Sequence, residues 1–100
     1  MNGKIEYQFT ATIWQYYSPK GSWYFVSVPQ DISTEIRENL KWQEEGWGRL
    51  KVRAKINDTN WDTAIWFNTK SKKYILPLKA GIRLKEKLEL DDSIQITIGI

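Results

Sequence analysis

The clearest pattern in the chain is a strict alternation of apolar and polar residues, which is typical of β-strands with one buried face. It is most regular over residues 50–56, where every polar position is Lys or Arg. The same period of two runs through residues 5–13 and through residues 94–100. We therefore predict strands at these three places, each with one face turned to water.

Further β-prone runs at residues 23–28, 61–68 and 74–78 are separated from their neighbours by turn residues. The turn Ser18-Pro19-Lys20-Gly21-Ser22 lies between the strand over residues 5–13 and the first of these runs, and predicts that the two form an antiparallel hairpin. Pro29 ends the 23–28 strand because proline has no N–H to donate to a sheet. The pattern thus predicts six strands.

Two segments show a helical period instead. Ile32, Ile36 and Leu40 recur at every fourth residue with charged residues between them, which predicts an amphipathic helix over residues 31–42. A second helical pattern predicts a helix over residues 79–88. Each helix follows a strand and a proline.

This order of strand, proline and helix gives an internal echo between the two halves of the chain, which places Val26, Val28 and Pro29 opposite Tyr74, Leu76 and Pro77. Two readings stay open. Either the echo is a coincidence between two similar strand-to-helix junctions, or two similar halves close around one core and remove the exposed strand edges that invite aggregation.

Four blocks of the chain carry a resemblance to a known family. They are Phe25-Val26-Ser27-Val28-Pro29, Leu50-Lys51-Val52-Arg53-Ala54-Lys55-Ile56-Asn57, Trp61-Asp62-Thr63-Ala64-Ile65-Trp66 and Tyr74-Ile75-Leu76-Pro77-Leu78-Lys79-Ala80-Gly81-Ile82-Arg83. In their order and spacing these blocks resemble the domain of unknown function 1905 family. The resemblance covers nearly the whole chain. Its most specific part is the Leu-Pro-x-Lys-x-x-x-Arg block at the end of this series.

The resemblance implies a mainly β chain with two short helices, folded as a six-stranded double-split, partly open β-barrel. The family shares this fold in outline with AbrB-type DNA-binding regulators, in which two chains build the barrel. Here one chain would contain both halves. The family has no settled activity, so the resemblance informs the fold rather than the function. The chain departs from the family at Asp91-Asp92, where Gly-Asp is frequent, and at Ala64, where serine is frequent.

Composition points to one globular domain over residues 1–100. The chain is 41% hydrophobic and 27% charged, a balance that allows it to fold alone. It has neither the apolar segment of a secretory signal at its start nor a stretch of about 18 apolar residues for a membrane span. We therefore expect a cytoplasmic protein that does not associate with membranes.

The residues that most often perform catalysis or bind metals are missing. The sequence has no Cys and no His, which excludes disulfides, thiol nucleophiles, zinc knuckles and histidine general bases. A glycine-rich phosphate loop is also absent, because Gly46-x-Gly48 lacks a third glycine and precedes a strand. We expect no cofactor, no metal and no catalytic residue, and an enzyme is the least favoured function.

Aromatic residues are the more informative feature. The chain has six Trp, five Tyr and three Phe, and Trp is rarely buried completely. The net charge of +3 is by itself too small to indicate nucleic-acid binding, although the basic surplus lies downstream of residue 35. The surplus Trp residues either form a stacking platform for bases or sugar rings or pack as a second cluster under the helices.

The leading hypothesis is a small binding module with a basic and aromatic surface for nucleic acid or another anionic, ring-bearing ligand. Its candidate binding residues are Arg53, Lys55, Trp61, Trp66, Lys79 and Arg83. The alternative is a module for protein interaction or oligomerisation, which predicts an exposed apolar patch without a coherent basic rim. The sequence leaves the ligand and the oligomeric state open.

Overall fold

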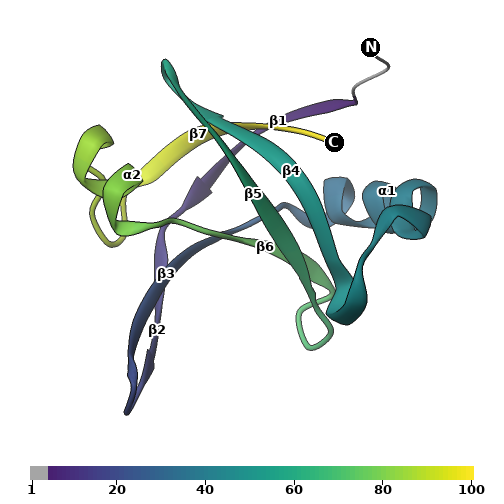
Figure 1. Ribbon diagram of the computed structural model, residues 1–100, viewed down its shortest axis with the longest axis horizontal. Coiled ribbons are helices and arrows are strands. Elements are labelled where there is room, and N and C mark those ends of the chain that lie inside the picture. Colours follow the sequence, from purple (N-terminus) through teal and green to yellow (C-terminus); the bar gives the residue numbers. More distant parts are fainter. Residues whose placement is uncertain (1–4) are drawn as a thin grey trace.

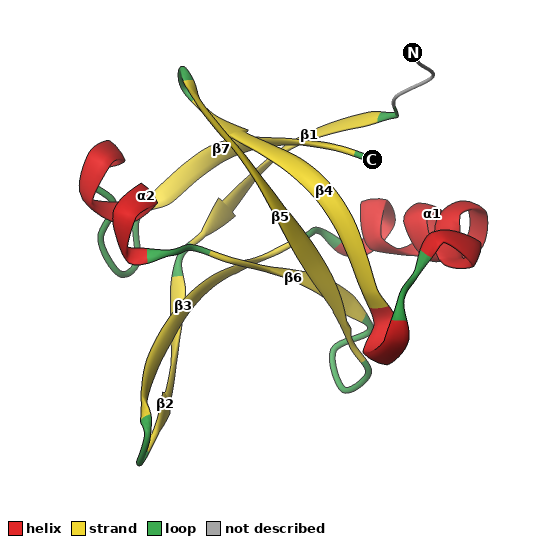
Figure 2. Ribbon diagram, viewed as in Figure 1, coloured by secondary structure: helices red, strands yellow, loops and turns green. Residues whose placement is uncertain are grey.

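Seven antiparallel strands form one curled sheet in the computed structural model, which describes residues 5–100 (Figures 1 and 2). The strands lie in the order β1-β7-β4-β5-β6-β3-β2. In chain order the elements are β1 (Glu6–Thr12), β2 (Trp14–Ser18), β3 (Gly21–Ser27), α1 (Gln30–Leu40), the 3₁₀ turns η1 (Lys41–Gln43) and η2 (Gly46–Gly48), β4 (Arg49–Ile56), β5 (Thr59–Asn68), β6 (Lys73–Pro77), α2 (Ala80–Glu86) and β7 (Ser93–Gly99).

The two end strands of this sheet, β1 and β2, are consecutive in the chain and are separated only by Ile13. The Ile13 N–H donates to the Asp92 carbonyl over 2.9 Å, and the Ile13 carbonyl accepts from the Asp91 N–H over 3.0 Å. Its backbone groups therefore bond to a turn and not to a neighbouring strand. The chain bends here and joins the two ends of the sheet, which gives the predicted mainly β, partly open barrel.

The bend also explains why seven strands occur where six were predicted. The β-prone run that begins at residue 5 continues beyond Ile13, but its first part pairs with β7 and its second part pairs with β3. The predicted hairpin turn is present, but β3 pairs with β2 and not with the strand over residues 5–13 as predicted. Figure 1 shows the β2–β3 hairpin extending away from the rest of the sheet.

Two halves with the same order of elements build the barrel, as the sequence echo suggested. When β1 and β2 are counted as one bent strand that joins the two ends of the sheet, the strand order becomes a closed circle. Exchanging this strand with β5, β3 with β6, and β4 with β7 gives the same circle read in the opposite direction. The backbone bonds match as well, because Val28 donates to Tyr74 and Leu78 donates to Tyr24, both over 2.8 Å. These bonds make Val28 equivalent to Leu78, so the predicted alignment of Val28 with Leu76 is wrong by two residues.

Both predicted helices are present within one to two residues at each end. α2 begins one residue later than predicted because Lys79 still has extended backbone angles, with φ −64° and ψ 153°. It ends early at Lys87, whose left-handed conformation (φ 55°) lets the Leu88 N–H bond to the Arg83 carbonyl. α1 and α2 flank the sheet on opposite sides in Figure 1.

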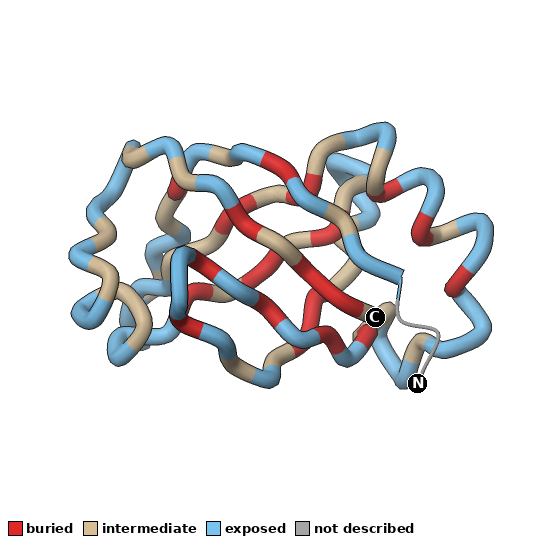
Figure 3. The backbone as a smooth tube through the Cα atoms, turned by 90° about the horizontal axis from the view of Figure 1, so that it is seen from above, coloured by how far each residue is buried: buried red, intermediate tan, exposed pale blue. Residues whose placement is uncertain are grey.

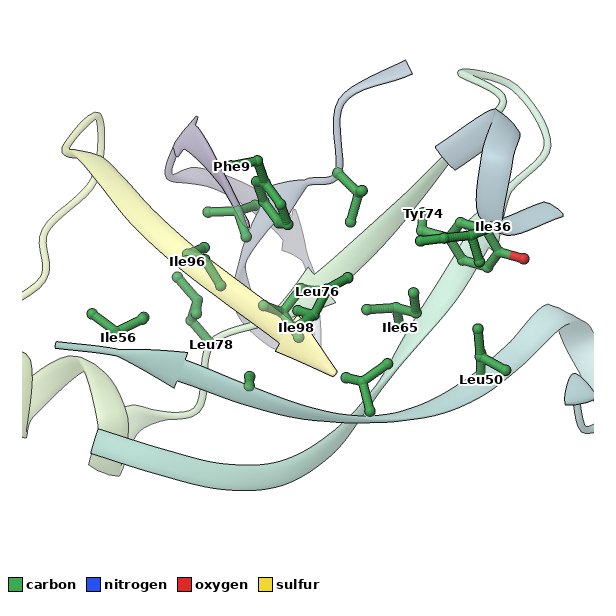
Figure 4. Packing of buried hydrophobic residues seen from close by; sticks show 14 of the residues in the cluster. Phe9, Ile36, Leu50, Ile56, Ile65, Tyr74, Leu76, Leu78, Ile96 and Ile98 are labelled. Carbon is green, nitrogen blue, oxygen red and sulfur yellow. The ribbon is translucent and has the colours of Figure 1, made fainter. Parts of the chain in front are cut away.

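The core lies inside the curled sheet, as the buried segments in Figure 3 show. β4 confirms the predicted alternation, since each of its apolar residues is buried and each Lys between them is exposed. Figure 4 shows how side chains from different strands meet there. The largest fully buried side chains include Ile13, Val26, Val28, Ile36, Leu50, Ile65, Tyr74, Leu76, Ile96 and Ile98.

One buried hydroxyl group ties α1 to the sheet. The Ser33 Oγ donates to the Val28 carbonyl over 2.9 Å and accepts from the Tyr74 N–H over 3.0 Å. Ser33 is fully buried, so water cannot replace either bond. It therefore connects the first turn of α1 to both β6 and the segment that follows β3.

We expect Ser33→Ala to lower the free energy of unfolding by about 1–3 kcal/mol, because the Tyr74 N–H would stay buried without an acceptor. Urea unfolding followed by circular dichroism measures the change. Ser22→Ala is the matched control, since Ser22 is exposed on β3 and should change stability by less than about 0.5 kcal/mol. Equal effects of the two substitutions would contradict the role given to Ser33.

Candidate functional site

The outer face of the sheet carries a groove of about 660 Å³ that crosses β4, β5 and the end of β6. We call it the basic groove, because four of the residues that surround it are Lys or Arg. Its lining residues are Arg49, Lys51, Val52, Arg53, Asp62, Thr63, Ala64, Trp66, Pro77, Lys79 and Gly99.

Small side chains leave room for this groove. Ala64 on β5 is only 1% exposed, even though the residues two positions before and after it are on the outer face. It lies opposite Lys51 of β4, and Gly99 of β7 lies opposite Arg53. Pro77, the last residue of β6, completes the set. Long basic side chains thus rise beside a floor of short ones.

Carboxylates already neutralise part of the positive charge. Glu45, just before η2, accepts a hydrogen bond from Arg49 and lies 3.4 Å from the Lys51 Nζ. Asp62 accepts from Arg53 across the β4–β5 pair over 3.2 Å. Within residues 5–100, Lys79 makes no ion pair. The groove therefore keeps an excess of positive charge, with Lys79 available to a ligand.

The two basic residues beside Glu45 also change its acidity. Partial desolvation acts to raise the pKa of the Glu45 carboxyl, but the hydrogen bond from Arg49 and the charge of Lys51 outweigh it, so this pKa lies below its usual range. Glu45 is therefore ionised near neutral pH and competes with any anion for Arg49 and Lys51. Arg49 also lies 5.7 Å from the ring centroid of Trp66, its partner across the strands.

A family model described as Domain of unknown function (DUF1905) matches residues 9–98 of the chain. The chain belongs to this family. No curated protein matches it. The matched segment begins in β1 and ends in β7, so the other five strands lie wholly within it, together with every groove residue except Gly99. Ala64, one of the two departures noted in the sequence, is on the groove floor.

In this DUF1905 domain the groove brings together three of the six residues expected to bind a ligand. Arg53, Trp66 and Lys79 all line it, although they come from three separate segments of the chain. Lys55 lies farther along β4 and lines a different, more polar cavity of about 440 Å³ together with Gln8, Gln95 and Thr97.

Trp61 and Arg83, the other two expected residues, have structural contacts instead. Trp61 is partly buried and packs against the core, on the same side of β5 as the buried Ile65. The Arg83 guanidinium stacks 3.9 Å above the Tyr24 ring, and its Nε donates to the Leu78 carbonyl over 3.0 Å. Arg83 thus anchors α2 to β3 and lies outside the groove lining.

Sequence reasoning missed two groove residues, Arg49 and Lys51. The signal was present in the alternation of β4, which puts both on the same face as Arg53. The alternation does not show which strand lies beside β4. Only the pairing of Arg49 with Trp66 and of Lys51 with Ala64 shows that this face borders an aromatic residue and a gap.

The surplus Trp residues are spread over the surface and do not form one platform. Trp66 is the tryptophan that lines the basic groove. Trp42 and Trp47 are 79% and 95% exposed in the segment between α1 and β4, and Trp47 has a left-handed backbone with φ 71°. Trp14 donates through its indole N–H to the Ser27 hydroxyl over 3.0 Å, and Trp23 is exposed on the same hairpin.

Two further observations on residues 5–100 concern membrane spans and metal sites. No helix in this part of the chain is long and apolar enough to cross a membrane. The same residues contain no group of three or more Asp and Glu side chains arranged to hold a metal ion. The basic groove is the candidate functional site because it gathers four basic residues and an aromatic one.

Proposed function

We propose that this domain binds an anionic, ring-bearing ligand in the basic groove, with single-stranded nucleic acid as the form to test first. The observation that supports this most is the meeting of Arg49, Lys51, Arg53 and Lys79 around a groove that Trp66 also lines. A positively charged groove with an aromatic side chain is how proteins hold single strands without reading sequence. The cytoplasmic location expected from the sequence belongs to the same proposal.

The ion pairs already present around the groove suggest the order in which a ligand would contact its basic residues. Phosphate groups would approach Lys79 first, because it makes no ion pair within residues 5–100. They would then compete with Glu45 for Arg49 and Lys51, because both basic residues already pair with its carboxylate. A ring of the ligand would lie against the half-buried Trp66. Aromatic stacking of this kind contributes roughly 1–3 kcal/mol per base.

Reversing the charge of two groove lysines tests the proposal. We expect the double variant Lys51→Glu, Lys79→Glu to bind a mixed-sequence single-stranded oligonucleotide at least about tenfold more weakly at low salt, because phosphate contacts supply most of such affinity. Both side chains are exposed, so the fold should be retained. Fluorescence anisotropy of the labelled oligonucleotide gives the dissociation constants.

The control is Lys70→Glu, Lys72→Glu, which changes net charge equally in the loop between β5 and β6, outside the groove lining. If binding depends on the groove, this control weakens it far less. Equal weakening by both pairs would mean that only net charge matters and that the groove is not the site.

Removing the competing carboxylate should have the opposite effect. We expect Glu45→Gln to tighten binding about two- to fivefold, because breaking an exposed ion pair frees Arg49 and Lys51 at a cost of about 0.2–1 kcal/mol. Glu38→Gln, at an exposed position of α1, is the matched control for net charge. If Glu45→Gln binds no more tightly than Glu38→Gln, Glu45 does not compete with the ligand.

A protein-interaction role is the second candidate, and one observation favours it. The β2–β3 hairpin exposes Tyr16, Tyr17 and Trp23, and none of them lines the basic groove. Exposed aromatic residues without nearby charge are typical of the centre of a protein interface.

A further inference from the structure

The outer edge of β2 is an unpaired strand edge. Within residues 5–100, β2 forms sheet bonds only with β3, and β3 in turn pairs with β6 only over Phe25–Ser27. The outer half of the hairpin is therefore a two-stranded ribbon, visible at the lower left of Figure 1. Such an edge presents N–H and C=O groups that another strand can bond.

The pairing register shows which groups face outward. Leu78 donates to the Tyr24 carbonyl over 2.8 Å, so the backbone groups of Tyr24 face β6. Bonding directions alternate along a strand, so Trp23 faces β2, and its partner Tyr16 faces β3. On β2 the alternation leaves Gln15 and Tyr17 with their N–H and C=O groups directed away from β3.

Ile13 gives an independent check of this direction. It precedes Gln15 by two residues and therefore faces the same edge. Its N–H and C=O bond outward to Asp92 and Asp91 in the turn before β7. That turn covers the edge at Ile13, whereas Gln15 and Tyr17 continue it without a partner in the described part of the chain.

The usual protection of an edge strand is missing here. Edge strands of natural proteins carry Lys, inward-pointing charged side chains or proline, and these oppose pairing with another chain. Residues 7–30 contain one charged residue, Lys20, in a chain with 27% charged residues. Lys20 lies in the hairpin turn and not on β2. Two copies of this edge can therefore approach each other without charge repulsion.

Aromatic side chains cover one face of the ribbon beside this edge. Trp14 and Phe25 pair across the strands with ring centroids 4.9 Å apart, and Tyr16 and Trp23 pair at 6.1 Å. Tyr16 is 55% exposed, and Tyr17 on the other face is 72% exposed. Aromatic residues are enriched, and charged residues depleted, at the centres of protein interfaces.

We propose that β2 pairs antiparallel with β2 of a second copy of this chain, in a register centred on Tyr16. In that register Gln15 lies opposite Tyr17 of the partner subunit, and the two residues exchange both backbone bonds. Two-fold symmetry repeats the exchange, so all the outward groups of Gln15 and Tyr17 are satisfied. The two Tyr16 residues form the close, non-hydrogen-bonded pair between them, with Cα atoms about 4.5 Å apart.

A second copy fits this edge better than an arbitrary strand for a geometric reason. The register uses the same residues on both sides, so it closes on itself and leaves no further edge to extend. It also extends the aromatic face into one continuous row, from Trp23 through both Tyr16 rings to the partner subunit's Trp23. The groove residues lie outside β2 and β3.

Sedimentation velocity of the ligand-free protein over a range of concentrations tests the proposal. We expect a concentration-dependent shift from 11.8 kDa toward twice this mass. Tyr17→Pro should abolish the shift, because it removes an outward N–H that β3 does not use, and proline is tolerated at a strand edge. Tyr16→Lys should abolish it too, since it places two positive charges directly opposite each other.

Ser22→Lys is the matched control, because it adds the same charge to the exposed hairpin on β3 and should still dimerise. Hydrogen exchange locates the contact: Gln15 and Tyr17 amides should become protected as protein concentration rises. The proposal is overturned if the wild-type protein stays monomeric into the high micromolar range. This holds also if the monomer binds extended peptides, because the occupant of the edge would then not be a second copy. A dimer that persists in Tyr17→Pro, or leaves both amides unprotected, also overturns it. No nucleic acid is present, so the outcome does not depend on the basic groove.

Discussion

Replacing Glu44 with alanine is expected to lower the free energy of unfolding by about 2–3 kcal/mol, because it breaks a largely buried polar cluster. The Glu44 side chain is 9% exposed. Its two oxygens accept from Arg37 Nη1, both over 2.8 Å, and one also accepts from the Tyr74 hydroxyl. Burial and then the bond to Glu44 raise the pKa of Tyr74. Without Glu44, the Tyr74 hydroxyl has no acceptor.

The expected loss is smaller than for a fully buried ion pair, because Arg37 is partly exposed and water can solvate its guanidinium. Urea unfolding measures it, with Glu38→Ala on the exposed face of α1 as the control. Combining Glu44→Ala with Tyr74→Phe should restore part of the stability, since no hydroxyl then stays unpaired. A loss below about 0.5 kcal/mol would mean that the cluster is well hydrated and does not fix the segment after α1.

Ile13→Ala is expected to destabilise the domain by about 2–5 kcal/mol, the range for truncating a fully buried aliphatic side chain. Ile13 sits at the bend between β1 and β2 and packs into the core from there. The cavity would therefore loosen the place where the two ends of the sheet join. Urea unfolding gives the magnitude, and hydrogen exchange should show faster exchange at the Ile13-bonded amide of Asp91.

Thr12→Ala is the control for this substitution, since Thr12 is the exposed neighbour at the end of β1. It should leave stability within about 0.5 kcal/mol of wild type. Similar losses from both substitutions would show that the bend depends on local strand propensity and not on burial of Ile13.

Alternation located the strands well because one face of each strand is buried, and β4 shows this most directly. The same signal showed only a change of phase after Ile13, where the apolar positions move from the odd residues to Trp14 and Tyr16, and it did not show that the chain bends there. What ends the ladder there is a pair of backbone bonds to Asp91 and Asp92, which lie in the turn before β7, far away in the chain. The local pattern does not show which distant residues make these bonds.

The internal echo was visible in the sequence, but its exact alignment was not. The prediction aligned Pro29 with Pro77, yet Pro29 is the N-cap of α1 whereas Pro77 is the last residue of β6. The N-cap of α2, and therefore the equivalent of Pro29, is Lys79. Because the two prolines occupy different structural positions, an alignment based on them is shifted by two residues.

The groove was predictable only in part, for a related reason. Trp61 and Trp66 occupy an odd and an even position of β5, so their side chains lie on opposite faces of the strand. The sequence does not show which of these faces is turned inward. Strand order decides this, together with the neighbours that β4 and β6 supply. Arg83 illustrates the other limit, because its stacking on Tyr24 depends on how α2 packs against β3.

The salt dependence of oligonucleotide binding tests the central claim most directly. We expect a short mixed-sequence single strand to bind the wild-type domain at about 50 mM salt and to bind markedly more weakly at about 200 mM, because phosphate contacts release counterions. In Lys51→Glu, Lys79→Glu the dependence of log affinity on log salt should become shallower, by about 0.7 for each phosphate that the variant no longer neutralises. A folded wild-type domain that shows no binding at low salt, or a variant with an unchanged salt dependence, would contradict the assignment of the basic groove as an anion-binding site.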